Sequence, residues 1–200
     1  MTVLLTHARF IHIPKTGGSW VRLALRNSGL TLIEPIGILK HAPPSELPAD
    51  NLFSFAFVRN PWDWFRSWWG YRMQTNWQHA QEPMDVRCKS DSFQEFIDAM
   101  LEHFPGACTY SYERFLGKQF DAVNFIGRTE SLLEDLLSAL QQSESGPFDE
   151  QAIRQTKPAN ATNYQRFDAS YRPDQITAIA KTEARVCSHF GWLPPPGELA

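Results

Sequence analysis

The sequence predicts an α/β protein with a mainly parallel central sheet flanked by helices. Short apolar segments with strand character are each followed, after a few residues, by a segment with helical periodicity. The strand–helix pairs are 9–13 with 19–27, 52–58 with 61–73, and 123–126 with 130–141. Strands that alternate with helices typically form a parallel sheet with helices packed on its faces.

The first elements have clear local signals. The run 52–58 is almost continuously apolar, which suits a central strand buried on both faces. Pro61 favours the first position of a helix over 61–73, because its missing N–H would have no helical partner there. The segment 19–27 is partly apolar at helical spacing, and Gly29 is a typical helix stop.

The remaining elements are weaker or later in the chain. Residues 31–38 have strand character that is broken by a proline and a glycine. A helix over 92–104 begins with the cap Ser92 and has Glu95 at the matching position of a capping box. A final helix is predicted over 173–190, and a glycine follows it.

Composition limits the possible functions. With 200 residues and 42% hydrophobic content, residues 1–200 are expected to form a single domain with a sizeable core. The net charge of −3 argues against a nucleic-acid partner. Cys88, Cys108 and Cys187 lack metal-ligand spacing, so no metal is expected. No run of 18 apolar residues is present, so we expect no membrane span and a cytoplasmic location.

One glycine-rich segment has the character of an anion-binding loop. Residues 10–20 read Phe-Ile-His-Ile-Pro-Lys-Thr-Gly-Gly-Ser-Trp, a strand that leads directly into the loop. Gly17 and Gly18 allow a tight turn of the backbone, and Ser19 is placed to start the following helix. This is not the common nucleotide loop, because Lys15 precedes the glycines.

A second segment also passes from strand to helix. Residues 52–69 read Leu-Phe-Ser-Phe-Ala-Phe-Val-Arg-Asn-Pro-Trp-Asp-Trp-Phe-Arg-Ser-Trp-Trp. Arg59 ends the strand and Ser67 lies about two turns into the helix. We therefore expect both side chains to converge on one phosphate.

Together these segments resemble the donor site of sulfotransferases that use 3′-phosphoadenosine 5′-phosphosulfate (PAPS). Pro-Lys-Thr-Gly-Gly-Ser-Trp resembles their 5′-phosphosulfate loop, and Val-Arg-Asn-Pro followed by a serine resembles their 3′-phosphate element. Residues 125–136 and 171–192 are similar to later family segments, but loosely. The resemblance implies a P-loop-type three-layer sandwich, in-line sulfuryl transfer, PAPS as co-substrate and no metal.

The resemblance also implies roles for individual residues. Lys15 is expected to stabilise the bridging oxygen of the donor as the S–O bond breaks. Arg128 has two interpretations, a donor contact or a pair with Glu130. Lys157 is a candidate for the loop that closes over the donor, together with Asn160 and Arg166. The expected donor-binding residues are Lys15, Thr16, Gly17, Gly18, Ser19, Trp20, Arg59, Ser67, Arg128 and Lys157.

A base must remove the proton of the acceptor, and histidine suits that role near neutral pH. His41 lies between the two donor motifs and is our candidate catalytic base. His41 is equally well interpreted as an ordinary loop residue. In that case Glu46 or His12 is the better candidate for the catalytic base.

The sequence identifies the acceptor only as a small molecule or carbohydrate with a hydroxyl or amine group. It does not indicate the oligomeric state. Two alternative functions remain. One is a P-loop-type kinase for a small molecule or nucleotide, which would need a lysine after the glycines. The other is a non-catalytic adenosine-phosphate binding relative. Four clustered tryptophans suit either an acceptor cleft or a packed core; they are Trp62, Trp64, Trp68 and Trp69.

Overall fold

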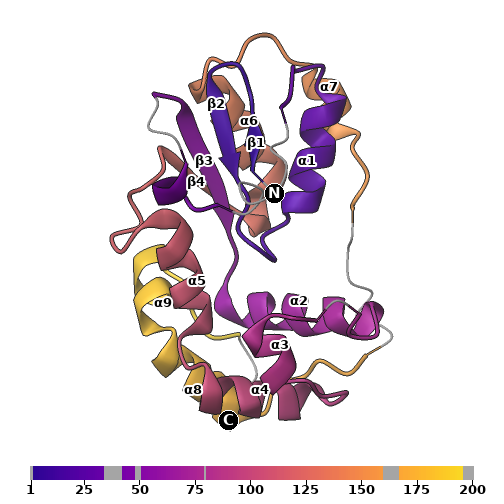
Figure 1. The fold of residues 1–200 in the computed structure, drawn as a ribbon, viewed down its shortest axis with the longest axis vertical. Helices are drawn as coiled ribbons and strands as arrows, with labels where there is room; N and C mark the ends of the chain where they lie inside the picture. The colour runs from indigo at the N-terminus through magenta and orange to yellow at the C-terminus, as the bar shows by residue number, and fades with distance from the viewer. Residues whose placement is uncertain (1, 34–41, 48–50, 79, 160–166, 196–200) are drawn as a thin grey trace. The chain divides into compact units, whose positions relative to one another are not determined.

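The computed structural model describes residues 2–33, 42–47, 51–78, 80–159 and 167–195. The chain forms two compact units, each made of two stretches of sequence (Figure 1). The first unit comprises Met1–Arg59 with Ser111–Ala161, and the second comprises Asn60–Tyr110 with Thr162–Ala200. The single domain expected over 1–200 stays a prediction, and the units are described separately.

A four-stranded sheet forms the centre of the first unit. Its strands are β1 (Val3–Leu4), β2 (Ala8–Ile11), β3 (Phe53–Val58) and β4 (Phe125–Arg128), adjacent in that order. β1 runs antiparallel to β2, whereas β2, β3 and β4 are parallel. The prediction of an α/β protein with a mainly parallel sheet is confirmed.

Two helices cover one face of this sheet. The apolar sides of α1 (Gly18–Asn27) and α6 (Leu132–Gln142) share one hydrophobic core with Phe10, Phe55 and Phe57. The three phenylalanines point to the same face because side chains alternate along a strand. This unit also contains η2 (Pro44–Glu46), η3 (Thr129–Ser131), α7 (Glu150–Arg154) and the end of α5 (Ala107–Leu116).

The second unit is helical and aromatic. Its helices are α2 (Pro61–Gln74), α3 (Pro83–Arg87), α4 (Phe93–His103), α8 (Pro173–Thr182) and α9 (Ala184–Phe190). The four clustered tryptophans of α2 are all buried, which supports a packing role rather than an open cleft. The Trp69 ring lies 5.3 Å from the Phe93 ring, and the Tyr171 hydroxyl donates to the carbonyl of Trp62.

A buried ion pair ties α3 to α2. Asp85 is fully buried and accepts hydrogen bonds from the guanidinium of Arg72 and from Nε1 of Trp68. A buried carboxylate needs such partners, because its desolvation would otherwise be very costly. The sequence analysis predicts no helix over the residues of α3.

The predicted helix over 173–190 is wrong at one position. Glu183 separates α8 from α9 and is fully buried. Its carboxylate accepts from the backbone N–H groups of Cys108 and Thr109 and from the Thr109 hydroxyl. Burial raises the pKa of Glu183 above the usual glutamate value, and the bonds from Thr109 and Cys108 oppose that rise. The predicted helix is therefore interrupted at Glu183, whose carboxylate binds the start of α5.

Other boundaries differ slightly. The strand predicted over 9–13 corresponds to β2, which begins at Ala8 and ends at Ile11. Ser92 caps α4 as expected, but Glu95 bonds the Ser90 hydroxyl, which in turn accepts from the Ser92 N–H. Of 31–38, only residues 31–33 are described, and Ile33 forms a bridge to Leu4. Among the described residues, no helix combines the length and apolar character needed to cross a bilayer.

Candidate functional site

The carboxyl ends of the three parallel strands lie at one edge of the first unit's sheet. β2 leads from this edge into the loop that contains Lys15, and β3 leads directly into Arg59. β4 ends there with Arg128, which pairs in register with Val58. Neighbouring strands are ~4.8 Å apart, so the strand ends that lead to the Lys15 loop, to Arg59 and to Arg128 are adjacent. Open α/β sheets usually bind ligands at this edge.

The Lys15 loop has an unusual backbone. Lys15 has φ 69° and Gly17 has φ 81°, both in the left-handed region. The carbonyl of Gly17 then accepts from the N–H groups of Trp20 and Val21, at 3.0 and 3.2 Å, and starts α1. Left-handed residues among right-handed ones occur in the backbone nests that bind anions. A lysine in this conformation is costly, which favours a functional constraint on the loop.

Two contacts constrain the Lys15 loop. The Thr16 side chain is fully buried, and its hydroxyl donates to the carbonyl of Ile13 at 2.9 Å. His12 packs directly against Gly18, so that a Cβ at Gly18 would lie 2.0 Å from Cδ2 of the imidazole. Thr16 is therefore a brace of the loop, and only glycine fits at position 18.

The start of α1 is electrostatically suited to an anion. The helix begins at Gly18, so Ser19 is its second residue rather than its cap. Gly17 provides no side-chain cap, and the first turn contains no acidic residue. By contrast, Asn60 caps α2 by accepting from the N–H of Asp63. The positive end of the α1 dipole thus faces the loop, and no carboxylate in the first turn of α1 neutralises it.

Arg59 is held through its backbone. The buried Tyr112 hydroxyl accepts from the Arg59 N–H at 2.9 Å and donates to the Arg59 carbonyl at 2.6 Å. Tyr112 belongs to α5 and has no exposed surface. This arrangement fixes the point at which the arginine leaves β3.

Arg128 has a similar backbone anchor on α6. Its N–H donates to Oδ2 of Asp135 at 2.7 Å, and the same oxygen accepts from the Ser131 hydroxyl. The Arg128 residue itself is exposed at the end of β4. Its register partner Val58 is the residue before Arg59, so Arg128 lies beside the end of β3.

Thr156 links Trp20 to Lys157, because it accepts a hydrogen bond from Trp20 and precedes Lys157 in the chain. Nε1 of Trp20 donates to the carbonyl of Thr156 at 3.1 Å, and Asn27 donates to the Thr156 hydroxyl at 2.9 Å. Thr156 thereby attaches the segment after α7 to the side of α1, and Lys157 is the next residue. Lys157 is exposed in this position.

Other expected site residues lie in the second unit or outside the described residues. Ser67 is 8% exposed on α2 and belongs to the second unit, so its convergence with Arg59 stays a prediction. His41, Asn160 and Arg166 lie outside the described residues. Of the alternative bases, Glu46 is exposed at the end of η2 and His12 is half-buried under the loop.

The sequence analysis missed the residues that hold this site in place. Tyr112, Asp135 and Thr156 each bond a site residue that lies 53, 7 and 136 positions away, respectively. Only Asp135 had a usable signal, since a carboxylate in the first turn of a predicted helix often bonds nearby backbone N–H groups. The other two contacts depend on the tertiary fold.

The described part of the chain contains no group of three or more His, Cys, Asp or Glu side chains placed to hold a metal ion. Comparisons of the chain with protein-family models, with curated proteins and with solved structures found no match.

Proposed function

We propose that the protein is a sulfotransferase that moves a sulfuryl group from PAPS to a hydroxyl or amine of a small molecule or carbohydrate. One observation carries the proposal: the Lys15 loop, Arg59 and Arg128 leave adjacent parallel strands at the same edge of one sheet. The proposed architecture is a P-loop-type three-layer sandwich, of which the α1 and α6 layer and the sheet are described.

The chemistry of the donor matches this edge. PAPS carries anionic groups at both the 5′ and the 3′ positions of its ribose. The 5′-phosphosulfate would bind the amides at the start of α1 and the ammonium group of Lys15. The 3′-phosphate would bind Arg59, with Ser67 as its expected partner. Trp20, Arg128 and Lys157 would bind the rest of the donor.

The reaction needs positioning and charge stabilisation more than covalent catalysis. The acceptor oxygen or nitrogen forms a bond to sulfur while the bond between sulfur and the bridging oxygen breaks. The electron pair of that bond stays on the 5′-phosphate, which leaves as 3′-phosphoadenosine 5′-phosphate. Lys15 would stabilise the charge that grows on the bridging oxygen.

The proton of the acceptor must go to a base. We keep His41 for this role because of its place between the two donor motifs, with His12 and Glu46 as alternatives. Removal of the base should lower turnover by about 10²–10⁴-fold and leave donor binding nearly unchanged. His41→Ala, His12→Ala and Glu46→Gln, each compared for turnover and nucleotide affinity, identify the residue.

Calorimetry tests the donor site. We expect tight binding of 3′-phosphoadenosine 5′-phosphate without metal and much weaker binding of adenosine 5′-phosphate. Arg59→Ala should remove most of this difference, since a charge-assisted bond to phosphate is a strong contact. Arg26→Ala, which changes an exposed arginine in the last turn of α1, is the control. Equal affinities for the two nucleotides would contradict the proposal.

Turnover separates the remaining alternatives. Release of 3′-phosphoadenosine 5′-phosphate from PAPS, dependent on an added acceptor, is the result expected of a sulfotransferase. Binding of ATP with Mg²⁺ in preference to PAPS would instead support a kinase. Tight nucleotide binding without turnover for any acceptor would support a non-catalytic relative.

A further inference from the structure

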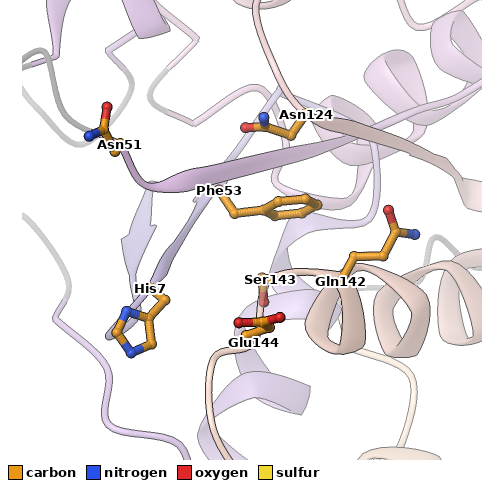
Figure 2. A pocket seen from close by; sticks show the side chains of 7 residues that line it. All are labelled: His7, Asn51, Phe53, Asn124, Gln142, Ser143 and Glu144. Carbon is orange, nitrogen blue, oxygen red and sulfur yellow. The ribbon is translucent and has the colours of Figure 1, made fainter.

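A pocket lies at the opposite edge of the same sheet, where the parallel strands begin (Figure 2). It has a volume of about 350 Å³, and four segments of the first unit line it. These are the residue before β2, the start of β3, the residue before β4 and the end of α6. The lining residues are His7, Asn51, Phe53, Asn124, Gln142, Ser143 and Glu144. In Figure 2 the ring of Phe53 occupies the middle of this group.

The backbone around the pocket is well anchored. The N–H of Phe53 donates to the carbonyl of His7, which joins the start of β3 to the start of β2. Asn124 Oδ1 accepts from the N–H of Ser54, and the Ser143 hydroxyl donates to the carbonyl of Leu140. The pocket is thus formed by the same bonds that hold the sheet and α6 in place.

Its polar side chains are left available to a ligand. Within the described part of the chain, the side chains of His7, Asn51 and Glu144 make no hydrogen bond or ion pair, and Asn124 uses only its amide oxygen. Glu144 also has φ 48°, a left-handed conformation that is unfavourable for a residue with a side chain. These groups provide both donors and acceptors around one aromatic ring.

This composition indicates the class of ligand. Among the described residues that line the pocket there is no lysine or arginine, and the one carboxylate, that of Glu144, disfavours an anion such as phosphate. Amide, imidazole and carboxylate groups match the several hydroxyls of an uncharged ring, and the Phe53 ring provides a flat apolar surface for the C–H face of such a ring. Pockets of this volume suit small ligands. We propose that the pocket binds one neutral sugar residue.

This site is separate from the proposed transfer centre. β3 has six residues, from Phe53 in the pocket to Val58 next to Arg59. The five steps between them span ~16 Å at ~3.3 Å per residue. A single sugar ring cannot cover that distance. The inference therefore does not depend on sulfuryl transfer, and failure of one proposal leaves the other standing.

Titration of the ¹⁵N-labelled full chain with neutral sugars tests the proposal. The probes are glucose, galactose, N-acetylglucosamine and maltose, each added to about 50 mM, since binding of one ring to an open site is expected to be in the millimolar range. We expect saturable shifts at the amides of 51–53, 124 and 142–144 for at least one sugar. Absence of saturable shifts at these amides for all four sugars would overturn the proposal.

Variants then assign the contacts. Glu144→Gln removes an exposed carboxylate that makes no hydrogen bond or ion pair in the described part of the chain. It should weaken the affinity about tenfold, since hydrogen bonds to a charged group are the stronger ones. Phe53→Leu should weaken it similarly, and its melting temperature shows whether the fold is kept. Glu82→Gln, which changes an exposed carboxylate at the N-cap of α3 in the second unit, should change nothing. Unchanged affinity in Glu144→Gln, or tighter binding of an organic cation such as choline than of any sugar, would overturn the proposal.

Discussion

The side chain of Tyr112 hydrogen bonds both backbone groups of Arg59, accepting from the N–H and donating to the carbonyl. A strand that ends at the edge of a sheet leaves its last polar groups without ladder partners, and here one buried phenol satisfies two of them. The side chain of Arg59 is therefore presented from a fixed backbone. The helix α5 that carries Tyr112 thus contributes to the proposed donor site without touching the donor.

Tyr112→Phe keeps the ring and removes this hydroxyl. We expect a loss of about 1–3 kcal/mol in the free energy of unfolding, because two half-buried backbone groups lose their partner. The preference for 3′-phosphoadenosine 5′-phosphate over adenosine 5′-phosphate should also decrease. Urea unfolding and calorimetry measure the two effects. Tyr110→Phe, which alters a 71% exposed tyrosine on the same helix, should stay within about 0.5 kcal/mol of the wild type.

Gly18→Ala tests the contact beneath the loop. The new methyl group would overlap the His12 ring, so the loop or the ring must move, at a cost of about 1–3 kcal/mol. Nucleotide affinity should decrease with it. The double variant His12→Ala, Gly18→Ala should recover part of both losses, as a double-mutant cycle would measure. Simple additivity of the two changes would show that the His12–Gly18 contact does not constrain the loop.

Lys15 combines an ammonium group with a left-handed backbone, and two substitutions separate these properties. Lys15→Ala and Lys15→Gly both remove the charge and should lower kcat much more than they weaken donor binding. Lys15→Gly should be more stable than Lys15→Ala by about 1 kcal/mol, since only glycine adopts positive φ without strain. Steady-state kinetics and thermal unfolding measure the pair. A raised KM with unchanged kcat would mean that Lys15 only holds the ligand.

Glu183 makes stability depend on pH in the second unit. Burial raises its pKa in the folded protein above the usual value of 4.5, so the folded state holds this proton more tightly than the unfolded state. The stability from the protonated form is complete below pH 4.5 and is lost as the pH rises through the raised pKa. Glu183→Gln should therefore gain stability relative to the wild type as the pH increases. Urea unfolding of both proteins from about pH 4 to about pH 8 tests this, and a constant difference would contradict it.

Two aspartates of the second unit provide a matched pair of ion-pair tests. Asp85 is buried with Arg72, whereas Asp98 bonds Arg172 on an exposed surface. Asp85→Asn should cost about 3–5 kcal/mol because it leaves a largely buried guanidinium without its counter-charge. Asp98→Asn should cost at most about 1 kcal/mol, and high salt should reduce that cost further. Similar costs for both substitutions in urea unfolding would show that burial is not the deciding factor.

Local patterns were sufficient for the elements that carry the two donor motifs. The apolar run before Arg59 and the proline at position 61 predicted β3 and α2 to within one residue. The sequence also predicted the loop after β2 from its glycines, because a left-handed turn and a close contact both favour glycine. What these patterns could not provide was the set of contacts that orient Arg59 and Lys157.

The elements that the sequence missed depend on distant partners. The pattern of Ile176, Ile179 and Val186 fits one continuous helix, and the break at Glu183 is caused by its bonds to residues 108 and 109. α5 was not predicted because its start is stabilised by that same carboxylate, 75 positions away. Tertiary contacts decided both outcomes over local propensity.

The two units alternate along the chain. Each unit consists of one stretch that ends before residue 111 and one that begins at residue 111 or later. During synthesis the ribosome therefore releases β1, β2 and β3 long before β4 and α6 exist to complete the sheet. Domains that are continuous in sequence fold in turn as they emerge, but neither unit here has that opportunity. The nascent chain must hold an unfinished, apolar sheet edge until β4 and α6 are made, and chaperone binding is expected in this interval.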